Sequence, residues 1–406
     1  VLNGSNWSNW MSNYFQLWVI VFIASLLTAC GSASAEQNTP VPETLFVSHY
    51  WTSEHEEQML QEAIDAFMRI NPDVTVVMES SRRTGRDFAE QANAGLGADM
   101  LVGLPLEEVI PLAEAGLLQE LSGYDIDTTE FRSQYLNAVR YQDRLYALPF
   151  MGKTSIMYYH KALTSTVPAD LDELLETPDE APVGIPVNFV AAFWGTQAFG
   201  TNLLGEEENV QLDLQSYVDW FEWLKEARNQ PGIILDDEVF FLREKFISGE
   251  LAYLIDSTDS LPQLKEAIDE TDVGVSPLPG GAAGPASPLA SLDVIAFNRA
   301  AAPAKIQAGL RLAEFLTNAS QQQKLVLEET GHIPVNRTVT IRPRLSEAGS
   351  AMAKQGATSI AIPLDYVDAF NQIRRVGDEA YLQALEGDSD SIEAAIYLFH
   401  EAGQSY

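Results

Sequence analysis

Residues 45–103 alternate between strand-like and helix-like patterns, and this alternation constrains the fold more than any other feature. Three apolar runs have the length and composition of β-strands: 45–50, 74–78 and 99–103. The first intervening segment repeats apolar residues at helical spacing and opens on a Ser53–Glu56 capping pattern. Another helix is expected over 86–94. Strands alternating with helices predict a parallel sheet covered by helices, with ligands at the carboxyl ends of its strands.

The rest of the chain continues the α/β pattern. A strand is expected at 252–255, and strand-like runs occur at 145–150 and 156–159. Further helices are predicted over 106–115 (broken by Pro111), 214–229, 238–247, 303–316, 365–385 and 391–402. A chain of 406 residues exceeds one typical hydrophobic core, and its 46% apolar content can fill two.

A largely apolar run near the N-terminus closes on Leu27-Thr28-Ala29-Cys30, which holds the single cysteine of the chain. This pattern predicts a signal peptide over 1–29 with a lipoprotein cleavage site, so that acylated Cys30 anchors the mature protein to a membrane. Residues 31–43 read as a flexible tether. Signal peptides normally begin with basic residues, whereas no Lys or Arg precedes Arg69 here. The alternative is a buried apolar helix with an incidental cysteine.

Charge and composition exclude several classes of protein. The chain has 58 acidic and 24 basic residues, for a formal net charge of −34. Nucleic-acid binding requires a cationic surface, which this balance does not provide. A lone cysteine excludes an intramolecular disulfide framework. The five histidines lack metal-ligand spacing, and no phosphate loop or complete dinucleotide fingerprint occurs, so no metal or cofactor is expected.

Several short motifs follow one another in the order of a known family. They are Ala66-Phe67-Met68-Arg69-Ile70-Asn71-Pro72, Tyr146-Ala147-Leu148-Pro149, Tyr158-Tyr159-His160-Lys161, Gly249-Glu250-Leu251-Ala252-Tyr253 and Thr330-Gly331-His332-Ile333-Pro334. In this order the chain resembles the bacterial extracellular solute-binding proteins of ABC importers, in the carbohydrate-binding group related to maltose-binding protein. The resemblance covers essentially all of the chain after Cys30.

The resemblance implies an α/β fold of the periplasmic-binding-protein type, with two lobes and a ligand cleft between them. Three hinge crossings are placed near Pro149–Lys153, Pro279–Gly281 and His332–Val335. The first lobe is then expected to hold 44–152 and 281–332, and the second 153–280 and 333–406. Closure would be a hinge motion around the solute. The implied partner is an ABC transporter permease in the membrane, and we expect a monomer.

Four candidate ligand-binding residues come from matches to family positions. Trp51 ends the first strand, where the cleft opens, and Glu54 matches a sugar-binding acid. Lys153 falls at the first crossing, and Trp194 matches an aromatic residue of the second lobe. Each has a purely structural alternative: a core tryptophan for Trp51 and Trp194, a carboxylate at a helix N-terminus for Glu54, and a solvated lysine for Lys153. Trp220 and Trp223 are expected to pack in a core.

Four more candidates mark departures from the family or hinge positions. The family commonly places a sugar-stacking Trp after the 252–255 strand, where this chain has Asp256-Ser257-Thr258-Asp259-Ser260. Asp256 and Asp259 therefore stand in that loop, and Asp293 replaces a common Gly. These acids could bind sugar hydroxyls, attract a cation, or merely be solvated. His332 lies at the third crossing, as a hinge or cleft residue.

The sequence thus predicts an extracytoplasmic, lipid-anchored solute-binding protein that performs no chemistry. The expected solute is a mono- or oligosaccharide. The acids at 256, 259 and 293 leave open a cationic solute, such as a polyamine or basic amino acid. A further alternative is an extracytoplasmic glycoside hydrolase, which needs two carboxylates flanking the scissile bond.

Overall fold

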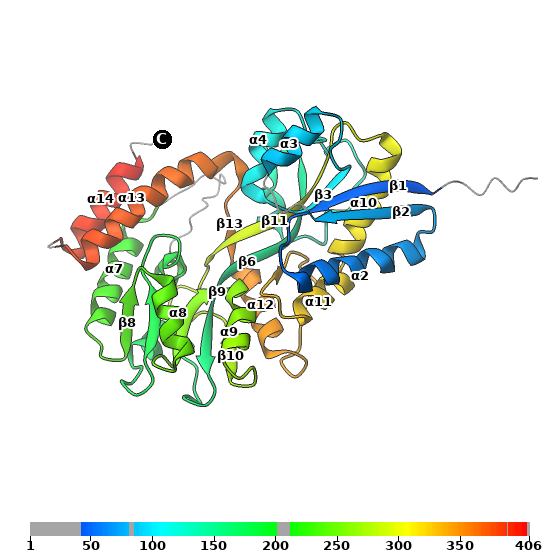
Figure 1. The fold of residues 1–406 in the computed structure, drawn as a ribbon. Helices are drawn as coiled ribbons and strands as arrows, with labels where there is room; N and C mark the ends of the chain where they lie inside the picture. The colour runs from blue at the N-terminus through cyan, green and yellow to red at the C-terminus, as the bar shows by residue number, and fades with distance from the viewer. Residues whose placement is uncertain (1–41, 81–84, 201–211, 388, 404–406) are drawn as a thin grey trace, which may run out of the picture. The chain divides into compact units, whose positions relative to one another are not determined.

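The computed structural model describes residues 42–80, 85–200, 212–387 and 389–403 (Figure 1). The predicted signal peptide, Cys30 and most of the tether lie outside the described residues. In the part described, no helix combines the length and apolar character needed to cross a membrane.

The opening of the described chain is the predicted parallel arrangement. β1 (Glu43–His49) lies between β2 (Val74–Ser80) and β3 (Met100–Pro105), and pairs with both in parallel. α2 (Glu54–Ile70) and α3 (Gly85–Asn93) connect these strands, which confirms the predicted order. A parallel strand needs such a crossover connection, which is why a helix follows each of the first two strands.

The capping pattern before α2 is also confirmed. The Ser53 hydroxyl accepts a hydrogen bond from the Glu56 amide at 3.1 Å and donates one to the Glu56 carboxylate at 2.7 Å. This satisfies one of the amides that a helix N-terminus leaves unpaired. The helix start fixes the direction in which α2 leaves Trp51.

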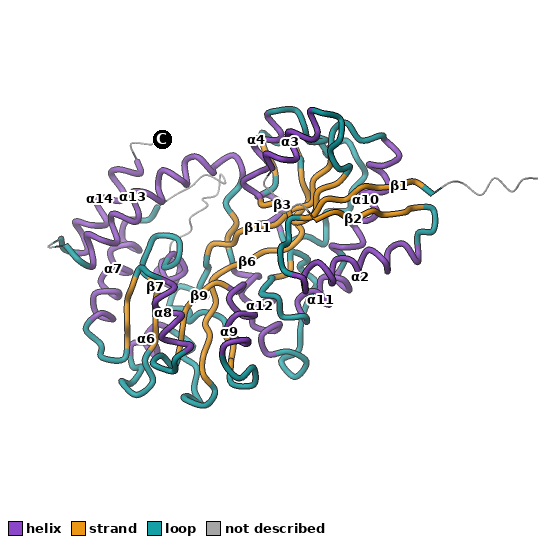
Figure 2. Tube along the Cα trace, viewed as in Figure 1, coloured by secondary structure: helices purple, strands orange, loops and turns teal. Residues whose placement is uncertain are grey.

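A single long strand, β6 (Ala147–His160), belongs to both halves of the sheet. Its first part, 147–154, pairs antiparallel with β11 (Leu289–Phe297), and its second part, 155–159, pairs with β9 (Tyr253–Ser257). The strand order is β2-β1-β3-β11-β6-β9-β7-β8, and Figure 2 shows the path through β6. The two strand-like runs predicted from sequence are therefore parts of one strand.

The first lobe is defined here by β2-β1-β3-β11 and the second by β9-β7-β8, joined through β6. β7 (Val183–Pro186) pairs in parallel with both β8 (Ile233–Asp236) and β9. The carboxyl ends of these parallel strands therefore lie at one edge of the sheet. The residue boundaries of the lobes given above stay predictions.

The remaining elements complete both lobes. They are η1 (Leu106–Glu108), α4 (Val109–Glu114), α5 (Ser133–Ala138), β4 (Arg140–Tyr141), β5 (Arg144–Leu145), α6 (Leu171–Leu175), η2 (Phe193–Phe199), α7 (Leu214–Arg228), α8 (Val239–Ile247), η3 (Thr258–Ser260), α9 (Leu261–Ala267), β10 (Val273–Ser276), α10 (Pro303–Thr317), α11 (Ala319–Leu327), β12 (Ile333–Pro334), α12 (Glu347–Thr358), β13 (Ile360–Ala361), η4 (Leu364–Tyr366), α13 (Val367–Leu385) and α14 (Ser391–Gly403). α13 and α14 lie beside α7 (Figure 1).

The expected break at Pro111 is wrong in its position. The irregularity falls between η1 and α4, at residues 108–109, and Pro111 lies within the first turn of α4. The reason is that amides in a first turn have no intrahelical acceptor, so a proline there removes no hydrogen bond.

Two hydrophobic cores follow the alternation of side chains along the strands. On β9, Leu254 packs in the first core, whereas Tyr253 and Ile255 pack in the second. On β6, Tyr158 joins the first core and Met157 the second. Successive side chains of a strand point to opposite faces, so the second lobe's sheet is covered on both sides.

The turn after α11 packs against the loop after β9. This packing predicts that alanine substitutions at two glycines differ in their effect on stability. Gly331 has a φ of +89°, and a Cβ there would lie 2.3 Å from the Thr258 carbonyl oxygen and 2.5 Å from the Asp259 Cα. Gly331→Ala should lower the free energy of unfolding by about 3 kcal/mol, through backbone strain and overlap together. Urea denaturation measures this loss.

Gly95→Ala is the matched control, because Gly95 has a φ of +75° but no neighbour within 4 Å of its added Cβ. It should cost about 1 kcal/mol, the backbone contribution alone. Equal losses for the two variants would show that the close packing at Gly331 is not present.

Candidate functional site

A cleft of about 560 Å³ lies along the strand that joins the two lobes. It is lined by Lys153, Thr154 and Ser155 of β6, Leu289, Ala290 and Ser291 of β11, Asp256 and Ser257 of β9, Val239 and Arg243 of α8, Phe370 and Arg374 of α13, and Glu107 of η1, with Pro186, Val190, Ala191 and Ile362. Residues from both lobes thus face one space. The mixture of backbone edges, hydroxyls, charges and one aromatic ring suits a small polar solute.

The carboxyl ends of the second lobe's strands open into this cleft. Pro186 ends β7, and Asp256 and Ser257 end β9. The Tyr158 hydroxyl, buried under the sheet, donates to the Ser257 and Thr258 carbonyls at 2.8 and 3.0 Å. Burial raises the pKa of Tyr158 well above its ordinary value, which keeps this donor protonated. The hydrogen bonds from Tyr158 therefore fix the position of the backbone where β9 ends and the next loop begins.

A buried ion pair forms one wall of the cleft. The Arg243 Nε donates to Asp256 Oδ2 at 2.7 Å, and its Nη2 donates to Asp256 Oδ1 at 3.2 Å. The Asp256 side chain is 2% exposed and the Arg243 side chain 13%. The hydrogen bond with Asp256 raises the pKa of Arg243, against the opposing effect of burial. The charge predicted at Asp256 is therefore present but already neutralised.

Lys153 is the other predicted residue that lines the cleft, and it is loosely paired. Its Nζ lies 3.9 Å from Asp259 Oδ2, with side chains 31% and 46% exposed. Asp259 lies in η3, which begins directly after β9. An exposed pair at this distance stabilises the fold little, and it leaves the Lys153 ammonium free to bind other oxygen atoms.

Trp51, Asp293 and His332 come together in a buried cluster beside β6. Trp51 Nε1 donates to Asp293 Oδ2 at 3.1 Å, and its ring stacks on Phe150 with a centroid distance of 5.1 Å. The His332 ring lies 5.0 Å from the Trp51 ring. His332 Nε2 is 3.7 Å from Asp293 Oδ2 and 3.6 Å from Glu56 Oε1. Asp293 is two residues along β11 from Ser291, which lines the cleft.

The charge of Asp293 is stabilised within this cluster. Burial alone would raise the pKa of Asp293, but His332, the charge of Lys153 and the Trp51 hydrogen bond together lower it below its ordinary value. The carboxylate is thus compensated by protein groups rather than held ready for a solute cation.

Glu54 and Trp194 lie elsewhere. Glu54 is exposed in the first turn of α2. Trp194 is fully buried in the second core, with its ring 5.4 Å from that of Trp220. Trp220 and Trp223 are also buried there, which confirms their predicted packing role. The cleft of the present conformation therefore does not expose the Trp194 ring to a solute.

Sequence reasoning did not single out Arg243, Phe370 or Arg374. Arg243 falls on the predicted helix 238–247, and Phe370 and Arg374 fall one turn apart on the predicted helix 365–385. A helical spacing of four puts the last two on one face. That spacing of an aromatic and a cation was a usable signal, but only the tertiary fold shows that this face meets the cleft.

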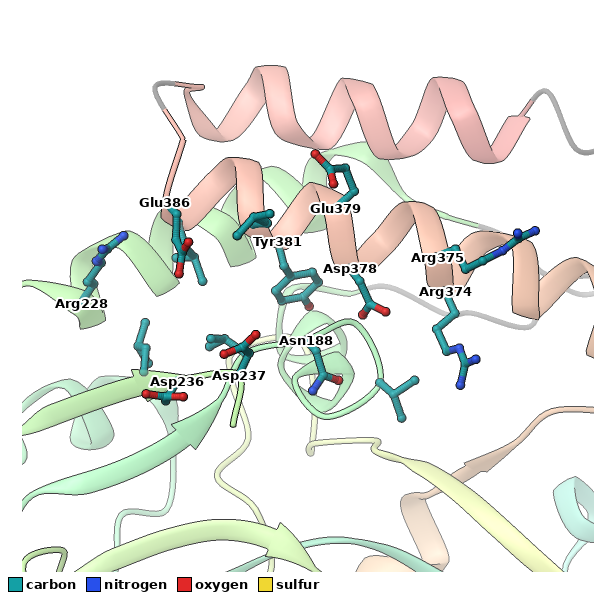
Figure 3. Close-up of a pocket in the computed structure, with 15 residues that line it drawn as sticks. Asn188, Arg228, Asp236, Asp237, Arg374, Arg375, Asp378, Glu379, Tyr381 and Glu386 are labelled. Carbon is teal, nitrogen blue, oxygen red and sulfur yellow. The ribbon is translucent and has the colours of Figure 1, made fainter. Parts of the chain in front are cut away.

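A larger hollow of about 730 Å³ lies under α13, next to the cleft (Figure 3). Asp236 and Asp237 at the end of β8, Arg375 and Asp378 on α13, and Glu386 directly after α13 contribute to its lining. Arg374 borders both spaces, and its side chain points away from that of Arg375 (Figure 3). We take the smaller cleft as the candidate site because it includes Glu107 from the first lobe together with residues of β6 and β11.

Among the described residues, no group of three or more His, Cys, Asp or Glu side chains is placed to hold a metal ion.

Comparison with known proteins identifies the family. Residues 62–355 match the model of the bacterial extracellular solute-binding protein family, and the chain belongs to this family. The maltotriose-binding protein of Pyrococcus abyssi (strain GE5 / Orsay) is 27% identical over 308 residues, which are 72% of this chain and 66% of that protein. The maltodextrin-binding protein MdxE of Bacillus subtilis (strain 168) is 24% identical over 291 residues, or 65% of this chain and 67% of the relative.

A solved structure of a cyclo/maltodextrin-binding protein complexed with maltotetraose matches with a TM-score of 0.73 at 19% identity, covering 89% of this chain and 97% of that one. This likeness confirms the predicted α/β fold with two lobes. The matched regions span about two thirds of the curated relatives' length. The protein is thus an extracytoplasmic solute-binding protein, and its family and relatives are binding proteins.

The buried pair in the cleft wall predicts a large loss of stability when one partner is neutralised. Asp256→Asn leaves the Arg243 guanidinium without its compensating charge, so the free energy of unfolding should fall by about 3 kcal/mol. Asp73→Asn is the control, because the Asp73–Arg311 pair has side chains 53% and 45% exposed. It should cost far less, because an exposed ion pair contributes little to stability. Urea unfolding that gave the two variants the same loss would contradict the buried pair.

Proposed function

We propose that this protein captures a short oligosaccharide of the maltodextrin class in the cleft along β6 and delivers it to an ABC transporter permease. The observation that carries the proposal is the cleft itself: both lobes contribute to it, and its floor is the strand shared by their sheets. The family membership and the maltotriose- and maltodextrin-binding relatives support this class of solute.

The chemistry of the cleft suits a neutral polyhydroxylated solute. Ser155, Ser257 and Ser291 offer hydroxyls, while Lys153 and Arg374 offer charged donors to sugar oxygens. Phe370 offers an apolar ring for the C–H face of a sugar. Solute binding would favour the closed arrangement of the lobes in proportion to its greater affinity for that form.

A cationic solute is less well supported. Asp259 is only loosely paired with Lys153, but the other two acids that suggested it are compensated: Asp256 by Arg243, and Asp293 by its buried cluster. Their remaining attraction for a polyamine is therefore small. We infer likewise that the protein performs no hydrolysis: its relatives are binding proteins, and Asp256, one of the two carboxylates that line the cleft, is bound on both oxygens by Arg243.

The proposal extends to location and assembly. Acylation of Cys30 would tether the protein outside the cytoplasm, and we propose that it works as a monomer beside its permease. The hinge crossings would lie near Pro149–Lys153 on β6, near His332–Val335 beside it, and near Pro279–Gly281, where Gly280 bridges to Asp170.

Isothermal titration with maltotriose tests the proposal, and Arg374 and its neighbour supply the variants. We expect maltotriose to bind the unmodified protein and spermidine not to bind. Arg374→Ala should weaken maltotriose binding about tenfold, because it removes a charged hydrogen-bond donor from the cleft. Arg375→Ala should leave the affinity unchanged, since Arg375 lines the other hollow.

Three results would count against the proposal: binding of spermidine without any malto-oligosaccharide, recovery of glucose after incubation with maltotriose, or equal losses for the two arginine variants. The first would restore the cationic solute, the second would restore hydrolysis, and the third would move the site away from the cleft.

A further inference from the structure

An exposed aromatic side chain lies next in sequence to a residue that lines the cleft. Phe240 lies in the first turn of α8 and is 72% exposed. Its neighbours Val239 and Arg243, on the same helix, both line the cleft. Single exposed apolar residues are common on protein surfaces, so exposure alone assigns no role. Its position beside two cleft-lining residues, and the contacts of its ring, carry the argument.

One face of the Phe240 ring is occupied by a fixed cation. The Arg243 Cζ lies 5.1 Å from the ring centroid. Arg243 is itself held by Asp256 through two hydrogen bonds, by the Ser260 hydroxyl at 2.8 Å and by the Gln263 side-chain oxygen at 3.1 Å. A guanidinium bound at so many points orients the ring and leaves much of the ring's surface in solvent.

The neighbouring loop lacks an aromatic residue. The segment after β9 runs Asp256-Ser257-Thr258-Asp259-Ser260, and the aromatic ring that lines the cleft is Phe370 on α13. Phe240 itself is not among the residues that line the cleft, whereas Phe370 is. A solute short enough to lie wholly against the lining residues therefore contacts Phe370 but not Phe240.

We propose that Phe240 forms an outer subsite that packs against a sugar ring of longer oligosaccharides and so sets the preferred length of the solute. This inference rests on the proposed function, because it assumes that the cleft binds a saccharide. The ring preoriented by Arg243 loses little conformational entropy when the solute packs against it. The subsite adds affinity for long solutes and none for short ones.

The test compares Phe240→Ala with Phe241→Ala by isothermal titration against maltose, maltotriose and maltotetraose. Phe241 is the matched control: it is adjacent, 44% exposed, and its ring lies 5.0 Å from the Lys245 ammonium rather than against Arg243. Phe240→Ala should weaken maltotetraose binding about tenfold and leave maltose binding unchanged. The Phe241→Ala variant should bind all three sugars as the unmodified protein does. The Phe240→Trp variant, which keeps an aromatic ring, should retain the affinity of the unmodified protein for maltotetraose.

The outcomes separate this inference from the proposed function. If the unmodified protein binds none of the three sugars, both fail. If it binds them but Phe240→Ala changes no affinity, weakens all lengths by one factor, or behaves as Phe241→Ala does, the outer subsite is wrong while saccharide capture stands.

Discussion

The structure depends on one constraint, which is that β6 satisfies its backbone hydrogen bonds in two sheets at once. Residues 147–154 pair with β11 and residues 155–159 with β9, without an intervening loop. Buried backbone groups left unpaired are costly, so this strand cannot leave either sheet without loss. The two lobes are therefore connected by a hydrogen-bonded ladder, and a hinge motion must take the form of bending or twisting around it. The cleft residues Lys153–Ser155 lie where the pairing changes from one partner to the other.

The charges near this strand are arranged differently from those of the protein as a whole. The chain carries a net charge of −34, yet Asp256 of the cleft and nearby Asp293 are matched by a cation or a hydrogen-bond donor. Arg243 neutralises Asp256 in the cleft wall, and Trp51 donates a hydrogen bond to Asp293. A strongly acidic surface keeps the protein soluble, while a compensated cleft does not repel the oxygen atoms of a solute. The Arg243–Asp256 pair thus stabilises the fold and also forms part of the cleft wall.

The sequence predicted what depends on local patterns. The Ser53–Glu56 cap, the helical face of α2 and the parallel order of β1 to β3 follow from residue spacing and were confirmed. The position of Pro111 was misjudged because the same residue breaks a helix interior but is tolerated in a first turn. Continuity of β6 was missed, since the polar Lys153–Ser155 segment interrupts its apolar pattern.

Contacts between distant segments could not be read from the sequence in the same way. Trp194 lies in the second core because α7 brings Trp220 against it, and the arginine that pairs with Asp256 comes from a different element. Arg374 enters the cleft because α13 lies across the carboxyl ends of the second lobe's parallel strands. Each of these depends on where a helix docks, and periodicity reveals which face is buried but not against what.

The central claim is that a solute bound along β6 changes the angle between two lobes that remain joined by that strand. Spin labels at Gln58 on α2 and Glu226 on α7, with Cys30 replaced by Ser, would report the interlobe distance by double electron–electron resonance. The account predicts that saturating maltotriose shifts the distance distribution to one new, narrower population. It also predicts that the maltotriose is recovered intact. An unchanged distribution at demonstrated saturation would contradict it.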